Sequence, residues 1–127
     1  MIMKYLGVDF GLRRVGLAIS EGSIASPFKT IEVKDFSDAV EKIFQLVEKM
    51  GFSKIVIGLP EGKMGQTVRG FINALKKKGL DIVGADETLS SKQAILDMIA
   101  QNAPREKRKV TDAAAAAIIL QNWLDSL

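Results

Sequence analysis

The stretch Lys4-Tyr5-Leu6-Gly7-Val8-Asp9-Phe10-Gly11 predicts a buried β-strand that carries a single carboxylate. Side chains alternate between the two faces of a strand, so Leu6, Val8 and Phe10 share one face and Asp9 lies on the other. A buried carboxylate is unfavourable unless a counter-charge or a metal replaces its water. Two glycines near the acid leave room for a ligand. Asp9 is therefore the first candidate functional residue.

The composition limits the chemistry that is open to this chain. The 127 residues, 47% of them hydrophobic, are expected to form one domain over residues 1–127. The chain has no cysteine and no histidine. Disulfides, zinc fingers, thiolate nucleophiles and Ser-His triads are thus excluded, and hydrolysis would need carboxylates, lysines, hydroxyls or a metal. We find no signal-peptide pattern and no apolar run near the ~20 residues of a membrane span, so we expect a cytoplasmic protein with no membrane partner.

The positive charge is concentrated in one short segment. Residues 105–109 hold four basic residues and one acid, which accounts for the whole net charge of +3. A local basic cluster on an otherwise neutral domain is what binding to a phosphate backbone needs. A solvated loop would give the same count, so both interpretations stay open at this point.

The hydrophobic pattern predicts a mixed α/β sheet. Strands are expected at residues 4–10, 14–20, 28–33, 54–59 and 80–85, and helices at 38–50, 67–78, from Ser90 onward and at 110–124. Ser37 or Asp38 is the expected cap of the first helix, and Gly51 its end. The order βββαβαβα indicates a five-stranded sheet with helices on both faces.

Three acids occupy related positions in this order. Asp9 lies on the first strand, Glu87 follows the last strand, and Asp112 is expected in the first turn of the final helix. The first strand is expected at the sheet centre, and the alanines at 113–117 would let the final helix approach it, so the three carboxylates could converge. Each acid also has a structural explanation: a turn cap for Asp9, solvation for Glu87 and the helix dipole for Asp112.

Four motifs, in this order, resemble the YqgF/RuvX family over nearly the whole chain. They are Gly7-Val8-Asp9-Phe10-Gly11-x-x-Arg14-x-Gly16-x-Ala18, Gly58-Leu59-Pro60, Asp86-Glu87-Thr88-Leu89-Ser90-Ser91 and Lys107-x-x-x-x-Asp112-x-x-Ala115-Ala116-x-x-Ile119-Leu120-Gln121. That family has the RNase H-like fold and is described as a pre-16S rRNA nuclease or a Holliday junction resolvase. The chain departs from its pattern at Thr88, where an arginine is usual, and in a short loop after Pro60.

The resemblance implies metal-dependent hydrolysis of phosphodiester bonds. Asp9, Glu87 and Asp112 match the catalytic acids, which would also bind divalent metal, expected as two ions of Mg²⁺ or Mn²⁺. Such hard cations take oxygen ligands. The residues expected to hold the phosphate backbone of a nucleic acid are Lys107, Arg108, Lys109 and, less strongly, Arg14.

The expected substrate is the 5′ end of pre-16S rRNA, a structured RNA. The alternatives are a resolvase of four-way DNA junctions and a non-catalytic nucleic-acid-binding module on the same fold. A resolvase needs two symmetric cuts and hence a dimer, whereas we expect a monomer or weak dimer. Asp9-Phe10-Gly11 also resembles a phosphate loop of actin-like ATPases, but those proteins need two such domains. A P-loop is excluded because Gly58-x-x-x-Gly62-Lys63-Met64 is one residue short and lacks the Ser or Thr.

Overall fold

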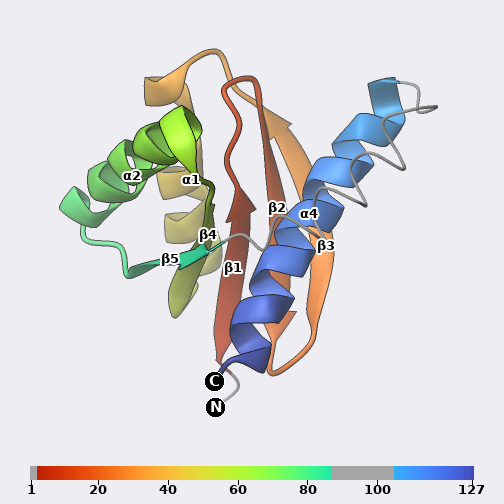
Figure 1. Cartoon of the computed structure of the whole chain (residues 1–127). Helices are drawn as coiled ribbons and strands as arrows, with labels where there is room; N and C mark the ends of the chain where they lie inside the picture. Colours follow the sequence, from red (N-terminus) through yellow and green to blue (C-terminus); the bar gives the residue numbers. More distant parts are fainter. Residues whose placement is uncertain (1–2, 87–104) are drawn as a thin grey trace.

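The computed structural model describes residues 3–86 and 105–127, and for residues 105–111 it describes the backbone alone. The strands are β1 (Lys4–Asp9), β2 (Arg14–Glu21), β3 (Ala25–Glu32), β4 (Lys54–Leu59) and β5 (Ile82–Asp86), and the helices are α1 (Phe36–Met50), α2 (Gly62–Lys77) and α4 (Arg105–Asp125). They form one five-stranded sheet in the order β3-β2-β1-β4-β5 (Figure 1). The predicted mixed sheet with β1 at its centre is confirmed.

The strand directions bring several strand ends to one edge of the sheet. β1 pairs antiparallel with β2 and parallel with β4, and β4 pairs parallel with β5. The carboxyl ends of β1, β4 and β5 therefore lie at the same edge, which we call the carboxyl edge. In such sheets, ligands bind beyond the carboxyl ends of the strands.

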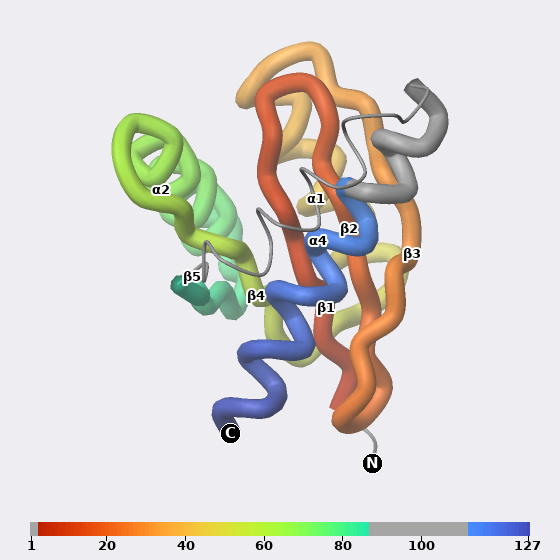
Figure 2. Tube along the Cα trace, turned by 45° about the vertical axis from the view of Figure 1, so that its right-hand side comes forward, coloured from red at the N-terminus to blue at the C-terminus, as the bar shows by residue number. Residues whose placement is uncertain are grey.

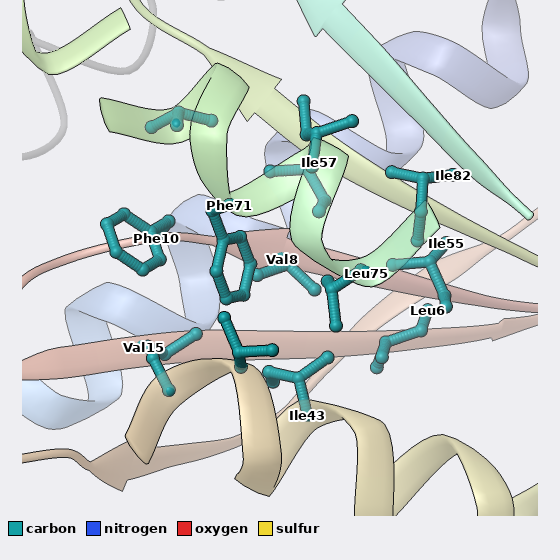
Figure 3. Close-up of a cluster of buried hydrophobic side chains, with 14 of the residues drawn as sticks. Leu6, Val8, Phe10, Val15, Ile43, Ile55, Ile57, Phe71, Leu75 and Ile82 are labelled. Carbon is teal, nitrogen blue, oxygen red and sulfur yellow. The ribbon is translucent and has the colours of Figure 1, made fainter. Parts of the chain in front are cut away.

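One face of the sheet carries the larger hydrophobic core. Leu6 and Val8 of β1 point from this face toward α1 and α2, as Figure 3 shows. Phe10 continues the same face beyond β1, and its ring lies 4.4 Å from that of Phe71 in α2, measured between centroids. Burial of these apolar side chains is the main force that holds α1 and α2 on the sheet.

The opposite face is lined by small residues and is covered by α4, which lies across β1 and β2 (Figure 2). Gly7 shows how close the helix is: a Cβ atom there would lie 2.7 Å from the Cβ of Leu120 and 2.8 Å from the carbonyl oxygen of Ala116. Nearer the start of β1, the rings of Tyr5 and Trp123 form a T-shaped pair with centroids 5.2 Å apart. The predicted packing of the alanine-rich helix against the first strand is confirmed.

A side-chain amide also ties α4 to the hairpin between β2 and β3. Gln121 accepts a hydrogen bond from the Ala25 N–H at 2.8 Å and donates one to the Ser23 carbonyl at 2.9 Å. Both bonds join positions almost a hundred residues apart in the chain. The second half of α4 is thus fixed to the sheet by polar as well as apolar contacts.

The cap of α1 differs from the one we predicted. Asp35 is the N-cap, and its carboxylate accepts a hydrogen bond from the Asp38 N–H at 2.8 Å. The Asp38 carboxylate accepts one from the Lys34 N–H, also at 2.8 Å. This bond, assisted by the Lys42 ammonium, lowers the pKa of Asp38. Two side-chain bonds to backbone amides thus begin the helix, and the predicted end at Gly51 is confirmed.

Two other helices begin earlier than the sequence predicted. α2 begins at Gly62 rather than near Thr67. Gly62 adopts a positive φ of 76°, which glycine tolerates. Gly65 in the first turn lies directly against the Pro60 carbonyl, where no side chain would fit. α4 begins at Arg105 rather than Val110. The helix expected to open at Ser90 lies outside the described residues. Among the residues that are described, no helix is both long and apolar enough to cross a bilayer.

The contact at Gly7 can be tested by adding one methyl group. Gly7→Ala should lower the free energy of unfolding by about 1–3 kcal/mol, because α4 would have to move away from β1. The matched control is Gly84→Ala, since a Cβ at Gly84 would make only ordinary contacts, the nearest at 3.5 Å to Ile72. Urea denaturation measures both. Equal stability of the two variants would contradict the close packing of α4.

Candidate active site at the carboxyl edge

Asp9 is the last residue of β1 and lies at the carboxyl edge. Its partner across the antiparallel ladder is Gly16 of β2. Such partners have Cα atoms about 4.5–5.5 Å apart and point their side chains to the same face of the sheet. The face in question is the one that α4 covers. Because Gly16 has no side chain, the space beside the half-buried Asp9 is open to the helix.

The backbone of α4 at Asp112 occupies that space. A Cβ atom at Gly16 would overlap the carbonyl group of Asp112 and would lie 3.0 Å from the amide nitrogen of Ala113. The backbone of Asp112 therefore lies on Gly16 of β2, and Gly16 is the ladder partner of Asp9 in β1. The structure brings these two predicted acids to the same place, although they are more than a hundred residues apart in the chain.

The position of Asp112 within α4 differs from our expectation. Since α4 begins at Arg105, Asp112 lies in the third turn of the helix and not in the first. The favourable effect of a helix dipole on an anion falls off within the first turn, so it does not explain an acid at this position. The contacts of Asp112 have to explain it instead.

Arg14 supplies the main contact of the Asp112 side chain. Its Nε atom donates to Asp112 Oδ2 at 2.8 Å, and the two side chains are 33% and 20% exposed. Arg14 is the first residue of β2, so it belongs to the same edge. Our sequence analysis assigned Arg14 to phosphate binding and did not foresee this pair. The spacing along the chain gave no signal for it, because the two residues meet only when α4 packs on β2.

The remaining predicted site residues are only partly described. Glu87 lies outside the described residues, but its neighbour Asp86 ends β5 and so lies at the carboxyl edge. Lys107, Arg108 and Lys109 belong to the first two turns of α4, where the backbone alone is described. Positions 108 and 109 precede Asp112 by one helical turn. The basic cluster is therefore part of the helix that carries Asp112 and is not a loop.

Several cavities lie along the carboxyl edge, and one of them is lined by Asp112. A small one of about 380 Å³ is lined by Leu12, Arg13, Arg14 and Asp112. A larger one of about 760 Å³ shares the first three of these residues and extends to the start of α1. A third, of about 630 Å³, lies at the start of α2 beside Asp86. Leu12, Arg13 and the residues before α1 could not be picked out from the sequence, since the family motifs leave these positions unspecified.

The donor atoms at this edge suit a hard divalent cation. Asp9 and Asp112 offer only carboxylate oxygens, the ligands that Mg²⁺ and Mn²⁺ prefer. The Arg14 guanidinium already places a positive charge against Asp112. Within residues 3–86 and the described side chains from 112 onward, no three acidic residues group together as a metal site. The third acid of the predicted set, Glu87, is not among those residues.

The element order and the mixed five-stranded sheet define an α/β protein with the RNase H-like fold. Its structural neighbours agree: Thermus thermophilus RuvC bound to a Holliday junction has a TM-score of 0.60 at 14% identity, with 98% of this chain and 94% of that one covered. Fowlpox virus resolvase with its junction DNA has a TM-score of 0.62 at 12% identity, covering 98% of both chains. At such low identity, these likenesses concern the fold alone.

The sequence comparisons identify the family. The model of the family described as "RuvX: Holliday junction resolvase" matches residues 3–126. A protein of Endomicrobium trichonymphae named "Putative pre-16S rRNA nuclease" is 37% identical over 133 residues, which cover 96% of this chain and 95% of that protein. One of the same name from Fusobacterium nucleatum is 37% identical over 134 residues, covering 96% of each. This chain belongs to the RuvX family.

The pair between Arg14 and Asp112 predicts a change in metal affinity. Arg14→Gln should tighten binding of Mn²⁺ by about two- to fivefold, because a partly exposed ion pair contributes roughly 0.5–1 kcal/mol and the metal would no longer compete with it. Calorimetric titration measures this affinity. Lys76→Gln is the control, since it removes one positive charge from the last turn of α2, away from the carboxyl edge. An affinity unchanged or weakened by Arg14→Gln would show that Arg14 does not compete for Asp112.

Proposed function

We propose that this protein is a cytoplasmic, single-domain, metal-dependent nuclease that processes the 5′ end of pre-16S rRNA by hydrolysing phosphodiester bonds. The observation that carries the proposal is the placement of Asp112 over Gly16, beside Asp9, at the carboxyl edge. Acids gathered at one edge of a sheet repel one another unless cations, such as the Arg14 guanidinium or a metal, neutralise them. The names of the family relatives support the reaction and the RNA substrate.

In this proposal, the carboxylates of Asp9, Glu87 and Asp112 hold the metal, as two Mg²⁺ or Mn²⁺ ions. When bound, such ions lower the pKa of the attacking water and stabilise the charge on the leaving oxygen. The chain itself has no histidine, so no imidazole serves as a general base. Asp9 is held by the central strand and Asp112 by a packed helix, and both are therefore fixed in position before the substrate arrives.

The positive charges position the substrate. Arg14 lies against Asp112, so a phosphate that reaches the acids comes within reach of its guanidinium. Lys107, Arg108 and Lys109 belong to the turns that lead to Asp112 and would bind the neighbouring phosphates. Contacts of this kind set the register of the strand without reading its sequence.

An RNA nuclease acting as a monomer or weak dimer fits the sheet edges better than a symmetric resolvase. β3 is an edge strand, and it carries Pro27, Lys29 and an irregular register opposite Leu17 and Ala18. Prolines, lysines and bulges on an edge strand oppose pairing with a second sheet. A resolvase that cuts two strands symmetrically needs a stable two-fold dimer.

Cleavage assays test the proposal directly. Wild-type protein should cut structured pre-16S rRNA with Mg²⁺ or Mn²⁺, whereas Asp9→Asn should reduce the rate at least about a hundredfold while remaining folded, since it removes a metal ligand. Asp81→Asn is the control, because Asp81 precedes β5 at the opposite edge of the sheet.

The same assay separates the alternatives. Four-way DNA junctions and single-stranded RNA serve as competing substrates, and sedimentation at micromolar concentration gives the oligomeric state. A stable dimer that nicks junctions in symmetric pairs and leaves RNA intact would replace our proposal with the resolvase. Binding of RNA without cleavage under any metal would favour the non-catalytic module. Full activity of Asp9→Asn would contradict the metal-nuclease proposal as a whole.

The basic cluster predicts the salt dependence of binding. Changing Lys107, Arg108 and Lys109 to Ser should weaken binding to all nucleic acids alike and flatten the slope of log K against log salt by about 2 to 3, since each lost phosphate contact contributes roughly 0.7–0.9. The control changes Lys76, Lys77 and Lys78 at the end of α2 to Ser, with the same loss of charge. Fluorescence anisotropy at several salt concentrations measures the slopes. Equal slopes for the two triple variants would remove the cluster from the interface.

A further inference from the structure

One cavity of the carboxyl edge has no part in the function proposed so far. It measures about 760 Å³, and we call it the turn cavity because the turn between β1 and β2 forms one wall and the start of α1 the other. Its lining consists of Leu12, Arg13, Arg14, Glu32, Val33, Lys34, Asp35 and Phe36. The volume lies within the roughly 300–1,000 Å³ that is usual for small-ligand sites.

The turn cavity adjoins the acids. Leu12, Arg13 and Arg14 line it and also line the smaller cavity that contains Asp112. Arg14 is bonded to Asp112 at 2.8 Å, so only the turn separates the two spaces. A polymer whose scissile bond lies at Asp112 can therefore extend directly into the turn cavity.

Apolar side chains form one part of the cavity wall. Leu12 is 55% exposed, so its apolar side chain is accessible in the lining of the cavity. Phe36 is half-buried, and its ring is fixed by edge contacts with Phe10 and Phe71, each with centroids 6.2 Å apart. Unpaired bases bind on such rigid apolar or aromatic surfaces.

The charged side chains of the cavity leave cations for a ligand. Asp35 is already engaged as the cap of α1, and Arg14 by Asp112. Glu32, the other acid of the lining, also has an interaction of its own. Within the described residues, the Arg13 guanidinium and the Lys34 ammonium form no ion pair within 4 Å, and the charge of Lys34 acts at longer range to help lower the pKa of Asp38. These two cations could bind the phosphate of a nucleotide, and the apolar surface beside them could bind its base.

We propose that the turn cavity binds one unpaired nucleotide of the substrate strand, adjacent to the bond held at Asp9 and Asp112. The base lies against Leu12 and Phe36, and its phosphate lies against Arg13 and Lys34. This inference rests on the proposed nuclease function and adds a substrate requirement to it. The strand has to be single-stranded on this side of the cleaved bond, because a base within a duplex cannot enter the cavity.

An abasic scan tests the inference. The probes are single-stranded RNA oligonucleotides that span the 5′ end of pre-16S rRNA, each lacking the base at one position, and binding is measured without divalent metal so that they are not cut. Removal of the base next to the cleaved bond should weaken wild-type binding, followed by fluorescence anisotropy, at least about fivefold, the lower end of what stacking one base contributes. Removal of bases farther along should have little effect. A scan without such a position would overturn the inference.

Protein variants then locate the base and the phosphate. Leu12→Ala should remove most of the abasic effect, whereas Ile24→Ala, a change at an equally exposed residue between β2 and β3, should keep it. Lys34→Gln should lower the salt slope by about 0.7, and Lys49→Gln at the other end of α1 should not. An abasic effect of full size in Leu12→Ala would place the base elsewhere and reject the turn cavity.

The outcome separates the inference from the proposed function. If the wild-type protein cleaves RNA but no single abasic position weakens binding, the proposed nuclease function stands and the nucleotide site is rejected. A protein that cleaves nothing, yet retains the position-specific abasic effect and its loss in Leu12→Ala, keeps the site and rejects the nuclease. A flat scan without cleavage rejects both.

Discussion

The close approach of α4 to the strand pair β1–β2 is the constraint on which the candidate site depends. Gly7 and Gly16 have no side chains on the face that the helix covers, and a methyl group at either one would meet α4. Close packing of this kind tolerates little change in volume. The same contact that closes the second core also sets Asp112 beside Asp9, so the stability of this layer and the geometry of the acids have one origin.

The central part of the fold could be predicted because local and long-range patterns agree there. The run around Asp9 is apolar, short and bounded by glycines, and it proved to be the central strand. The starts of α2 and α4 were predicted too late. At Gly62 the helix begins on glycines that usually indicate a loop, and only the fit of Gly65 against Pro60 favours the helix. Tertiary packing there outweighs local propensity.

The sequence allowed us to predict which residues belong to the candidate site, but not which of them contact one another. Asp9 is conspicuous in an apolar strand, and the alanines after Asp112 indicate a helix that packs closely. The bond from Arg14 to Asp112 could not be read from spacing, because it depends on where α4 crosses β2. The turn cavity was missed for a similar reason: its walls come from two loops that become neighbours only through the pairing of β2 with β3.

The two halves of α4 are held by different contacts. Trp123 packs on Tyr5, and Gln121 is bonded to the β2–β3 hairpin, whereas Asp112 lies nine residues earlier, about 14 Å along the helix axis, and is held by Gly16 and Arg14. A tilt of the helix by only a few degrees is enlarged over that length into a displacement of about 1 Å of one half against the other, comparable to the tolerance of a catalytic group. Evolution or design could thus tune this site from the opposite edge of the sheet, without touching a residue near the acids.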